Sequence, residues 1–275
     1  MSISSPRYTA PPVERLGRAS RTLAVLRHEL LSRAGLGTLL VVALAYIAVT
    51  LIVVFDADFA SAAGQLSVST YEAPFQSPLW ALVILIVATA AGAGSVAEDR
   101  GSRSIVLYLS RPIHLSDYLS AKAGSIGSWI LIAAVGPGLV AVGIVAALGV
   151  GSATVNLSAA AGFVATGVLA ALFFTGLALA LSSLTDRALY AGVAMFGLVL
   201  SLDIGVGVVS GITGNSTVLY ASPVTDLTSV AEAAFHVSGP YPTDPVSSAL
   251  LLAVVGGLLA AAAYWQLSQV EVVGE

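Results

Sequence analysis

Six long apolar stretches divide the 275-residue chain, and polar or glycine-rich segments separate them. Each stretch has roughly the 20 residues that an α-helix needs to cross about 30 Å of lipid hydrocarbon. None shows the alternation of apolar and polar residues that a membrane-spanning β-strand requires. A helix also satisfies its own backbone hydrogen bonds in lipid. The pattern therefore predicts an all-α integral membrane protein with six transmembrane helices, at residues 35–55, 78–97, 125–149, 159–182, 188–211 and 246–267.

The segment before the first span, residues 13–31, has the pattern of an amphipathic helix. At about 100° per residue, most of its apolar side chains fall in one sector and most of its charged ones in the other. The apolar sector holds Val13, Leu16, Ala19, Leu23, Ala24, Leu26, Leu30 and Leu31, with Ser20 and Arg27 as polar exceptions. We expect this helix to lie in the headgroup region of the membrane with its apolar face down. A solvated helix docked on a partner protein is the alternative.

All eleven Lys and Arg residues fall on one side of the membrane if the N-terminus is inside. They precede the first span or lie in loops 98–124 and 183–187. The charged residues of the opposite loops are all acidic. Positive residues mark cytoplasmic loops. We therefore expect a multi-pass protein of the cell (plasma) membrane, with a cytoplasmic N-terminus over residues 1–34, a transmembrane domain over 35–267 and a cytoplasmic tail over 268–275.

Composition supports this class, because only 9% of the residues are charged, against roughly 25% in a soluble domain. The longest outer loop, 212–245, contains Ser222-Pro223, a pair suited to the start of a helix. The sequence predicts a short helix from there to about Phe235, followed by a chain that Pro240, Pro242 and Pro245 keep from continuing as a helix.

Motifs for nucleotide binding and catalysis are weak in this sequence. The run Gly92-Ala-Gly94-Ser-Val-Ala97 matches the dinucleotide fingerprint literally, but that motif requires a preceding strand and a βαβ unit. In a membrane helix, its small residues suit close helix packing instead. An ATP-binding P-loop needs Lys followed by Ser or Thr, and Ala123 follows the only lysine, Lys122. The chain has no Cys and three scattered His residues, so we expect no catalytic residue and no metal site.

Asp203 is the one ionisable residue deep within a predicted span. It lies about 22 Å along a helix that starts at Ala188, at ~1.5 Å per residue, and therefore beyond the middle of the membrane. A charge in lipid is costly and usually functional, so Asp203 is a candidate intramembrane polar site. The alternative is that the fifth span ends early, near Gly205, and leaves Asp203 at the outer interface.

The segment Glu98–Lys122 carries the clearest resemblance to a known family. Ten of its residues match a pattern of an acidic residue, Gly-Ser, Leu-Tyr-Leu-Ser, Pro-Ile and a final Lys: Glu98, Gly101, Ser102, Leu107, Tyr108, Leu109, Ser110, Pro112, Ile113 and Lys122. The segment resembles the first cytoplasmic loop of ABC-2 type transporter permeases, including those similar to the nitrous-oxide-reductase maturation permease. Leu115 and Ala121 depart from the residues that are usual in that pattern. The stretch Gly101–Pro112 is also slightly longer than the corresponding stretch in typical members of the family.

The resemblance implies a six-helix permease subunit of an ABC transporter. Two such subunits pair, as a homo- or heterodimer, and two separate ATPase subunits, which hold ATP and magnesium, drive alternating access. The resemblance also implies that no cofactor binds this chain and that the direction of transport is export. The expected ATPase-coupling residues are Glu98, Arg100, Gly101, Arg103, Ser110, Arg111, Pro112, Ile113 and Lys122.

The physical character of this loop suits a coupling element. Its charged residues offer charge-assisted pairing, and Ser110-Arg-Pro112 supplies a break between helical pieces. An ordinary charged inner loop that obeys the positive-inside rule is the simpler alternative. The rival class is a membrane protein that ATP does not drive, either a secondary transporter or a scaffold or sensor.

Overall fold

A computed structural model describes residues 23, 26–28, 36–62, 64–76, 78–102, 114–239 and 241–269. Most of the predicted amphipathic helix over residues 13–31 lies outside this range, as do residues 103–113 and the end of the tail. All regular structure within the described residues is helical. The elements are α2 (Leu36–Ala62), η1 (Val68–Gln76), α3 (Pro78–Gly92), α4 (Gly94–Gly101), α6 (Leu115–Ala134), α7 (Gly136–Ala147), α8 (Ala153–Ser183), α9 (Ala188–Thr213), η2 (Ser216–Ala221), α10 (Pro223–Ala234) and α11 (Pro245–Ser268).

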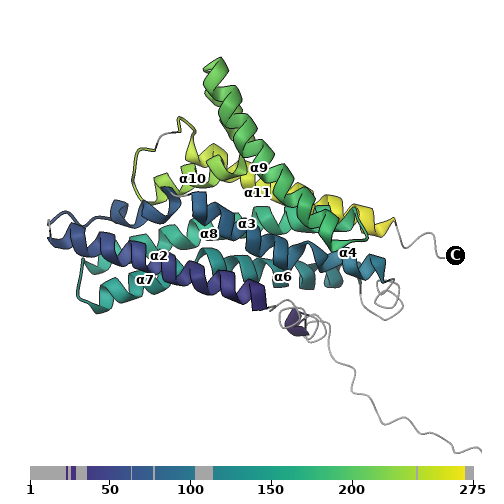
Figure 1. Ribbon diagram of the computed structural model, residues 1–275, viewed down its shortest axis with the longest axis horizontal. Coiled ribbons are helices and arrows are strands. Elements are labelled where there is room, and N and C mark those ends of the chain that lie inside the picture. The colour runs from purple at the N-terminus through teal and green to yellow at the C-terminus, as the bar shows by residue number, and fades with distance from the viewer. Residues whose placement is uncertain are drawn as a thin grey trace, which may run out of the picture.

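Six helices in the described part of the chain are long and apolar enough to cross a membrane, which confirms the predicted architecture (Figure 1). Two of these spans each consist of two helices. The second span breaks at Ala93, between α3 and α4. The third breaks at Val135, between α6 and α7, because Pro137 in the first turn of α7 has no N–H and disfavours an uninterrupted helix.

The third span begins earlier than its apolar stretch. Helix α6 starts at Leu115, ten residues before the predicted span, and its first turns bury Leu115, Tyr118, Leu119 and Lys122. This part of the helix is therefore covered by protein, which explains how it can contain polar residues. The segment 98–124 is correspondingly less of a loop than its sequence suggests, since residues 98–101 belong to α4.

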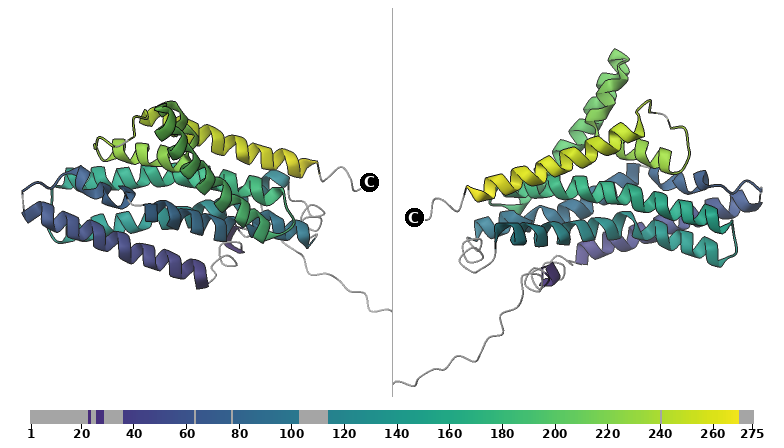
Figure 2. Two further views of the ribbon diagram at one scale, coloured as in Figure 1. Left: turned by 45° about the horizontal axis from the view of Figure 1, so that its top comes forward. Right: turned by 180° about the vertical axis from the view of Figure 1, so that it is seen from behind.

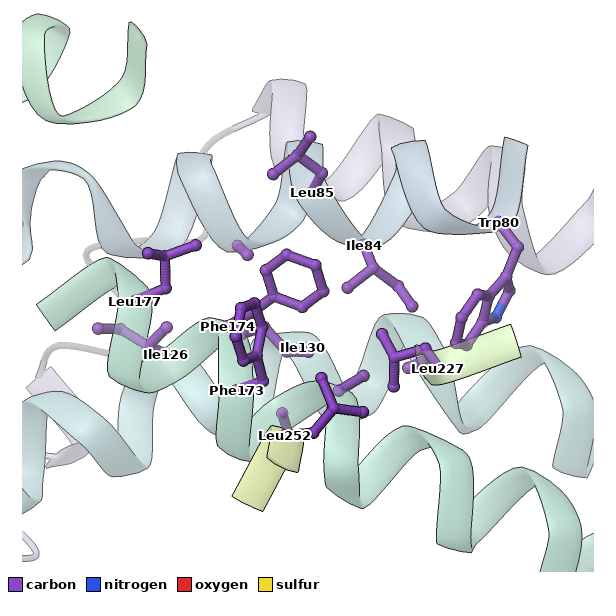
Figure 3. Close-up of a cluster of buried hydrophobic side chains, with 14 of the residues drawn as sticks. Trp80, Ile84, Leu85, Ile126, Ile130, Phe173, Phe174, Leu177, Leu227 and Leu252 are labelled. Carbon is purple, nitrogen blue, oxygen red and sulfur yellow. The ribbon is translucent and has the colours of Figure 1, made fainter. Parts of the chain in front are cut away.

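Helix α8 lies at the centre of the bundle and packs against α3, α6, α7, α10 and α11 (Figures 1 and 2). Figure 3 shows large apolar side chains of α3, α6, α10 and α11 gathered around those of α8. Phe173, Phe174 and Leu177 of α8 meet residues from its neighbours, among them Ile84, Ile130, Leu227 and Leu252. Helices α2 and α7 lie side by side at one edge.

Glycine allows the closest helix contacts in this bundle. A methyl group at Gly176 of α8 would overlap the carbonyl oxygen of Gly256 on α11. The close packing expected at Gly92 is also present, because a methyl group there would overlap the Cβ of Ala178 on α8. Helices associate in lipid largely through such close packing of small residues. These contacts hold α3 and α11 against α8.

Helix α9 diverges from the bundle along its length (Figures 1 and 2). Only Ala191, Gly192, Met195, Val199 and Val206 are buried along its 26 residues, and large apolar side chains such as Ile204, Val208 and Ile212 are exposed. The helix is therefore held mainly by its first half, next to α3, α4 and α8, and by its contacts with η2 and α10.

The connections between spans alternate between the two ends of the bundle. We call one the arginine end; it comprises the last turn of α4, the first turns of α6 and the α8–α9 connection at residues 183–187. The other is the carboxylate end, formed by η1, η2, α10 and the described residues 235–239 and 241–244. The predicted short helix of the longest loop is confirmed as α10, which begins after Ser222 with Pro223 in its first turn.

Candidate functional site

A buried ion pair joins the two helices that flank the predicted coupling loop. The Lys122 Nζ lies 2.8 Å from Asp99 Oδ2, and the Tyr118 hydroxyl donates to the same oxygen at 2.6 Å. The Lys122 side chain is only 1% exposed, so it is not available for direct contact with a partner protein. Within the predicted coupling segment, Lys122 therefore links α4 to α6 inside the protein.

Arg100 joins α4 to the other connection at the arginine end. Its Nε donates to Asp186 Oδ1 at 3.0 Å, and its guanidinium also donates to the backbone oxygen of Ser183. Gly101 packs against the same connection, because a methyl group there would lie 2.5 Å from the Asp186 backbone oxygen. The last turn of α4 and the α8–α9 connection are thus held together.

Ser182 of α8 stabilises the break in the second span. Its hydroxyl oxygen accepts hydrogen bonds from the backbone N–H groups of Val96 and Ala97, both at 2.9 Å. The same hydroxyl donates to the Ala93 carbonyl at 3.0 Å. Where a membrane helix breaks, its freed polar groups need another partner. A single side chain from α8 supplies it here.

We expect Ser182→Ala to destabilise the folded protein by about 1–2 kcal/mol, because it leaves buried backbone groups without this partner. The measurement is the thermal unfolding midpoint of the purified protein in detergent. Ser128→Ala is the matched control, since the Ser128 hydroxyl bonds only the Gly124 carbonyl of its own helix, a contact of little net value. Equal midpoints for the two variants would contradict the role of Ser182.

The other predicted coupling residues divide into two groups. Glu98 is exposed near the arginine end and borders an apolar groove of about 690 Å³ that α3, α4 and α9 form. The remaining five, Arg103, Ser110, Arg111, Pro112 and Ile113, lie outside the described residues.

Asp203 lies well inside α9 at the carboxylate end. The helix continues for ten residues beyond it to Thr213, and the position of Asp203 relative to the outer interface of the membrane stays a prediction. One oxygen of Asp203 accepts a hydrogen bond of 2.7 Å from the Ser222 hydroxyl. The same hydroxyl accepts from the Thr225 N–H at the start of α10, so Ser222 both caps α10 and ties it to α9.

Helix α10 is held in a buried position by polar contacts with its neighbours. The Ser248 hydroxyl of α11 donates to Asp226 Oδ1 at 2.7 Å, and the Thr243 hydroxyl donates to Ser229 at 2.9 Å. Asp226 is fully buried, and its other carboxylate oxygen has no hydrogen-bond partner within the described structure. Burial raises the pKa of Asp226 to about 6, which the bond from Ser248 partly opposes.

A cavity of about 530 Å³ opens beside α10, and Asp203 is one of the residues that line it. Two further carboxylates, Glu72 of η1 and Glu232 of α10, line the same cavity. The Glu232 side chain is only 5% exposed. Burial, and then repulsion from Glu72, raise the pKa of Glu232 to about 7.

Four aromatic rings pack next to this cavity. Phe75 lies 4.5 Å from Trp80, 5.5 Å from Phe163 and 5.2 Å from Phe235, measured between ring centroids. Phe75, Trp80 and Tyr241 line the cavity itself. Within the described residues, no group of three or more His, Cys, Asp and Glu side chains is arranged to hold a metal ion.

The sequence revealed only Asp203 of these three cavity carboxylates. Glu72 and Glu232 stood out merely as acidic residues of outer loops, because the loops carry no continuous apolar pattern. A signal for Glu232 existed in the predicted helix after Pro223, on which Leu227, Val230 and Ala231 share a face. An amphipathic helix in a loop implies that the loop packs against something, although not which residues it meets.

A family model described as ABC-2 family transporter protein matches residues 23–269 of this chain. Among curated proteins, none matches its sequence. The family match agrees with the six apolar helices and confirms the resemblance seen in residues 98–122, whereas similarity to the nitrous-oxide-reductase maturation permease stays a prediction. The chain belongs to the ABC-2 family of transporter membrane proteins.

Proposed function

We propose that this permease subunit works in an ABC exporter, in which two permease subunits pair and separate ATPase subunits drive alternating access. The observation that carries the proposal is the family match over residues 23–269. The sequence adds that the only lysine lacks the context of a P-loop. ATP and magnesium would therefore be held by the partner ATPase. In this proposal the arginine end faces the cytoplasm, because every Lys and Arg of the sequence precedes the first span or falls in the loops expected on that side.

The ATPase subunit docks at the arginine end in this proposal. The exposed groups that the structure describes there include Glu98, Leu184, Asp186 and Arg187. This surface mixes charges of both signs with an exposed leucine, as a docking face requires. The Lys122–Asp99 and Arg100–Asp186 pairs support the proposal, since they fasten this surface to α4, α6 and the α8–α9 connection. A movement of the docked ATPase would thus act on four spans.

We expect the double variant Glu98→Ala with Arg111→Ala to lose the ATPase partner. Removing charged groups from a desolvated contact costs about 2 kcal/mol or more, which weakens association about thirty-fold at ~1.4 kcal/mol per decade. Co-purification of the ATPase with tagged permease measures this directly, and ATP-dependent transport measures its consequence.

The control is Asp56→Asn with Asp58→Asn, which alters two charges near the other end of α2. This variant should keep the ATPase complex, and both variants should reach the membrane in equal amounts. If the Glu98 and Arg111 variant retains a full-strength complex, docking at the arginine end is wrong. If the unaltered chain recruits no ATP-binding subunit at all, the rival class of a membrane protein without an ATPase replaces the proposal.

A further inference from the structure

Three acidic side chains line the cavity at the carboxylate end. Glu72, Asp203 and Glu232 come from three different elements, η1, α9 and α10. No Lys or Arg is among the described residues that line the cavity, and the sequence places none in the loops at this end. Several carboxylates in one partly desolvated space are unfavourable unless they bind protons or a cation.

The cost of burying an ionised carboxylate applies directly to Glu232. Its side chain is only 5% exposed, and it lines the cavity. Its carboxylate has no hydrogen-bond or ion-pair partner among the described residues, in contrast to Asp203, which Ser222 satisfies. The backbone of Gly239 packs directly on the carboxylate, because a methyl group there would overlap it. The Glu232 side chain is thus held in place at the cavity, and no described group neutralises its ionised carboxylate.

The shape and lining of the cavity indicate the kind of cation. Its volume of about 530 Å³ lies in the range of roughly 300–1,000 Å³ typical of small-molecule sites. The carboxylates do not form a metal-binding group in the described structure. Phe75, Trp80 and Tyr241 add aromatic surface, and aromatic rings attract organic cations, with Trp the most effective. Carboxylates beside aromatic rings therefore match an organic ammonium or phosphonium ion with apolar substituents.

We propose that this cavity binds an amphiphilic organic cation, with Glu232 as its main counter-charge and Trp80 and Phe75 against its apolar groups. The inference rests on the proposed transport function, because it assigns the cavity to the substrate of that transporter. It extends that function by naming a class of substrate, which neither the family nor the sequence specifies.

Binding at this site depends on pH. The carboxylate of Glu232 has a pKa raised to about 7, and only its ionised form attracts a cation. The titratable groups that share the cavity with it are Glu72 from η1, Asp203 from α9 and the Tyr241 phenol; the described lining includes no residue of α8 or α11. Affinity for a cation should therefore be highest near pH 8 and fall by up to about tenfold by pH 6, as Glu232 becomes protonated.

The test uses the full chain in lipid nanodiscs, with radiolabelled tetraphenylphosphonium as the probe and tetraphenylborate as its anionic counterpart of nearly equal size. We expect saturable binding of the phosphonium and none of the borate. Glu232→Gln should weaken phosphonium binding about tenfold, which is ~1.4 kcal/mol, and should flatten its dependence on pH between 6 and 8. Asp58→Asn, the same change of charge at an exposed site outside this cavity, should alter neither.

Two outcomes would overturn the proposal: equal binding of both probes, or phosphonium binding that Glu232→Gln leaves unchanged. If Glu232→Gln does not fold, Asp203→Asn repeats the test, because an amide can still accept the hydrogen bond from Ser222. Co-purification of the ATPase is measured on the same preparations. Loss of the cation site with an intact ATPase complex refutes only the substrate class, whereas an absent ATPase complex refutes the transporter assignment.

Discussion

Replacing Lys122 with Met is expected to destabilise the folded protein by about 3–5 kcal/mol, the usual cost of breaking a buried ion pair from one side. The substitution keeps the length of the side chain but removes the ammonium group that lies 2.8 Å from the Asp99 carboxylate, which is only 16% exposed. The Tyr118 hydroxyl still donates to Asp99, but a neutral hydrogen-bond donor does not replace the charge of the ammonium group. The thermal unfolding midpoint in detergent and the yield of monodisperse protein measure the loss.

The double variant Lys122→Met with Asp99→Asn separates the ion pair from packing. Asn is neutral, so it does not need a counter-charge, and it can accept the hydrogen bond from Tyr118. The double variant should therefore be more stable than Lys122→Met alone. Arg187→Ala is the surface control at the same end, with an expected change of less than about 0.5 kcal/mol. Wild-type stability of Lys122→Met would show that the pair does not tie α4 to α6.

Gly176→Leu is expected to cost about 3 kcal/mol or more, because the new side chain must separate α8 from α11. Even a methyl group at this position would overlap the backbone of Gly256, and a backbone cannot move aside as a flexible side chain can. The α8–α11 contact is the most extensive between any two helices in the described structure. Separating these helices would therefore disturb much of the bundle.

Gly257→Leu is the matched control for this variant. Gly257 neighbours Gly256 on α11, but a methyl group at Gly257 would lie more than 4 Å from the neighbouring elements. The two substitutions add the same side chain to a membrane helix, so a difference in unfolding midpoint reports the close contact itself. Equal midpoints would mean that the helices can separate at little cost.

The spans and α10 could be predicted because their signals are local. A continuous apolar stretch identifies each membrane helix, and Ser222-Pro223 identifies the start of α10. The first turns of α6 gave no such signal, because Ser116, Asp117 and Ser120 interrupt their apolar residues. These turns are helical because they pack on other parts of the protein. A search for continuous apolar stretches detects only helices that cross lipid.

The candidate sites were less predictable, since they depend on contacts between distant residues. Lys122 reads as a loop lysine until Asp99, from another helix, is placed beside it. Glu72 and Glu232 are 160 residues apart in the sequence and share a cavity only because η1 and α10 meet at one end of the bundle. Ser182 likewise resembles any serine near a helix end, although it satisfies a helix break in α3–α4.

Helix α9 has the geometry of a lever. It starts directly after Asp186, which Arg100 holds, and carries Asp203 about 22 Å further along its axis at ~1.5 Å per residue. A tilt of only about 5° at its start would displace Asp203 by roughly 2 Å, more than a hydrogen bond tolerates. The bond between Asp203 and Ser222 would then open, and α10 would lose this hydrogen bond to α9. A small angular change at the arginine end is thus converted into a discrete event at the opposite end of the bundle.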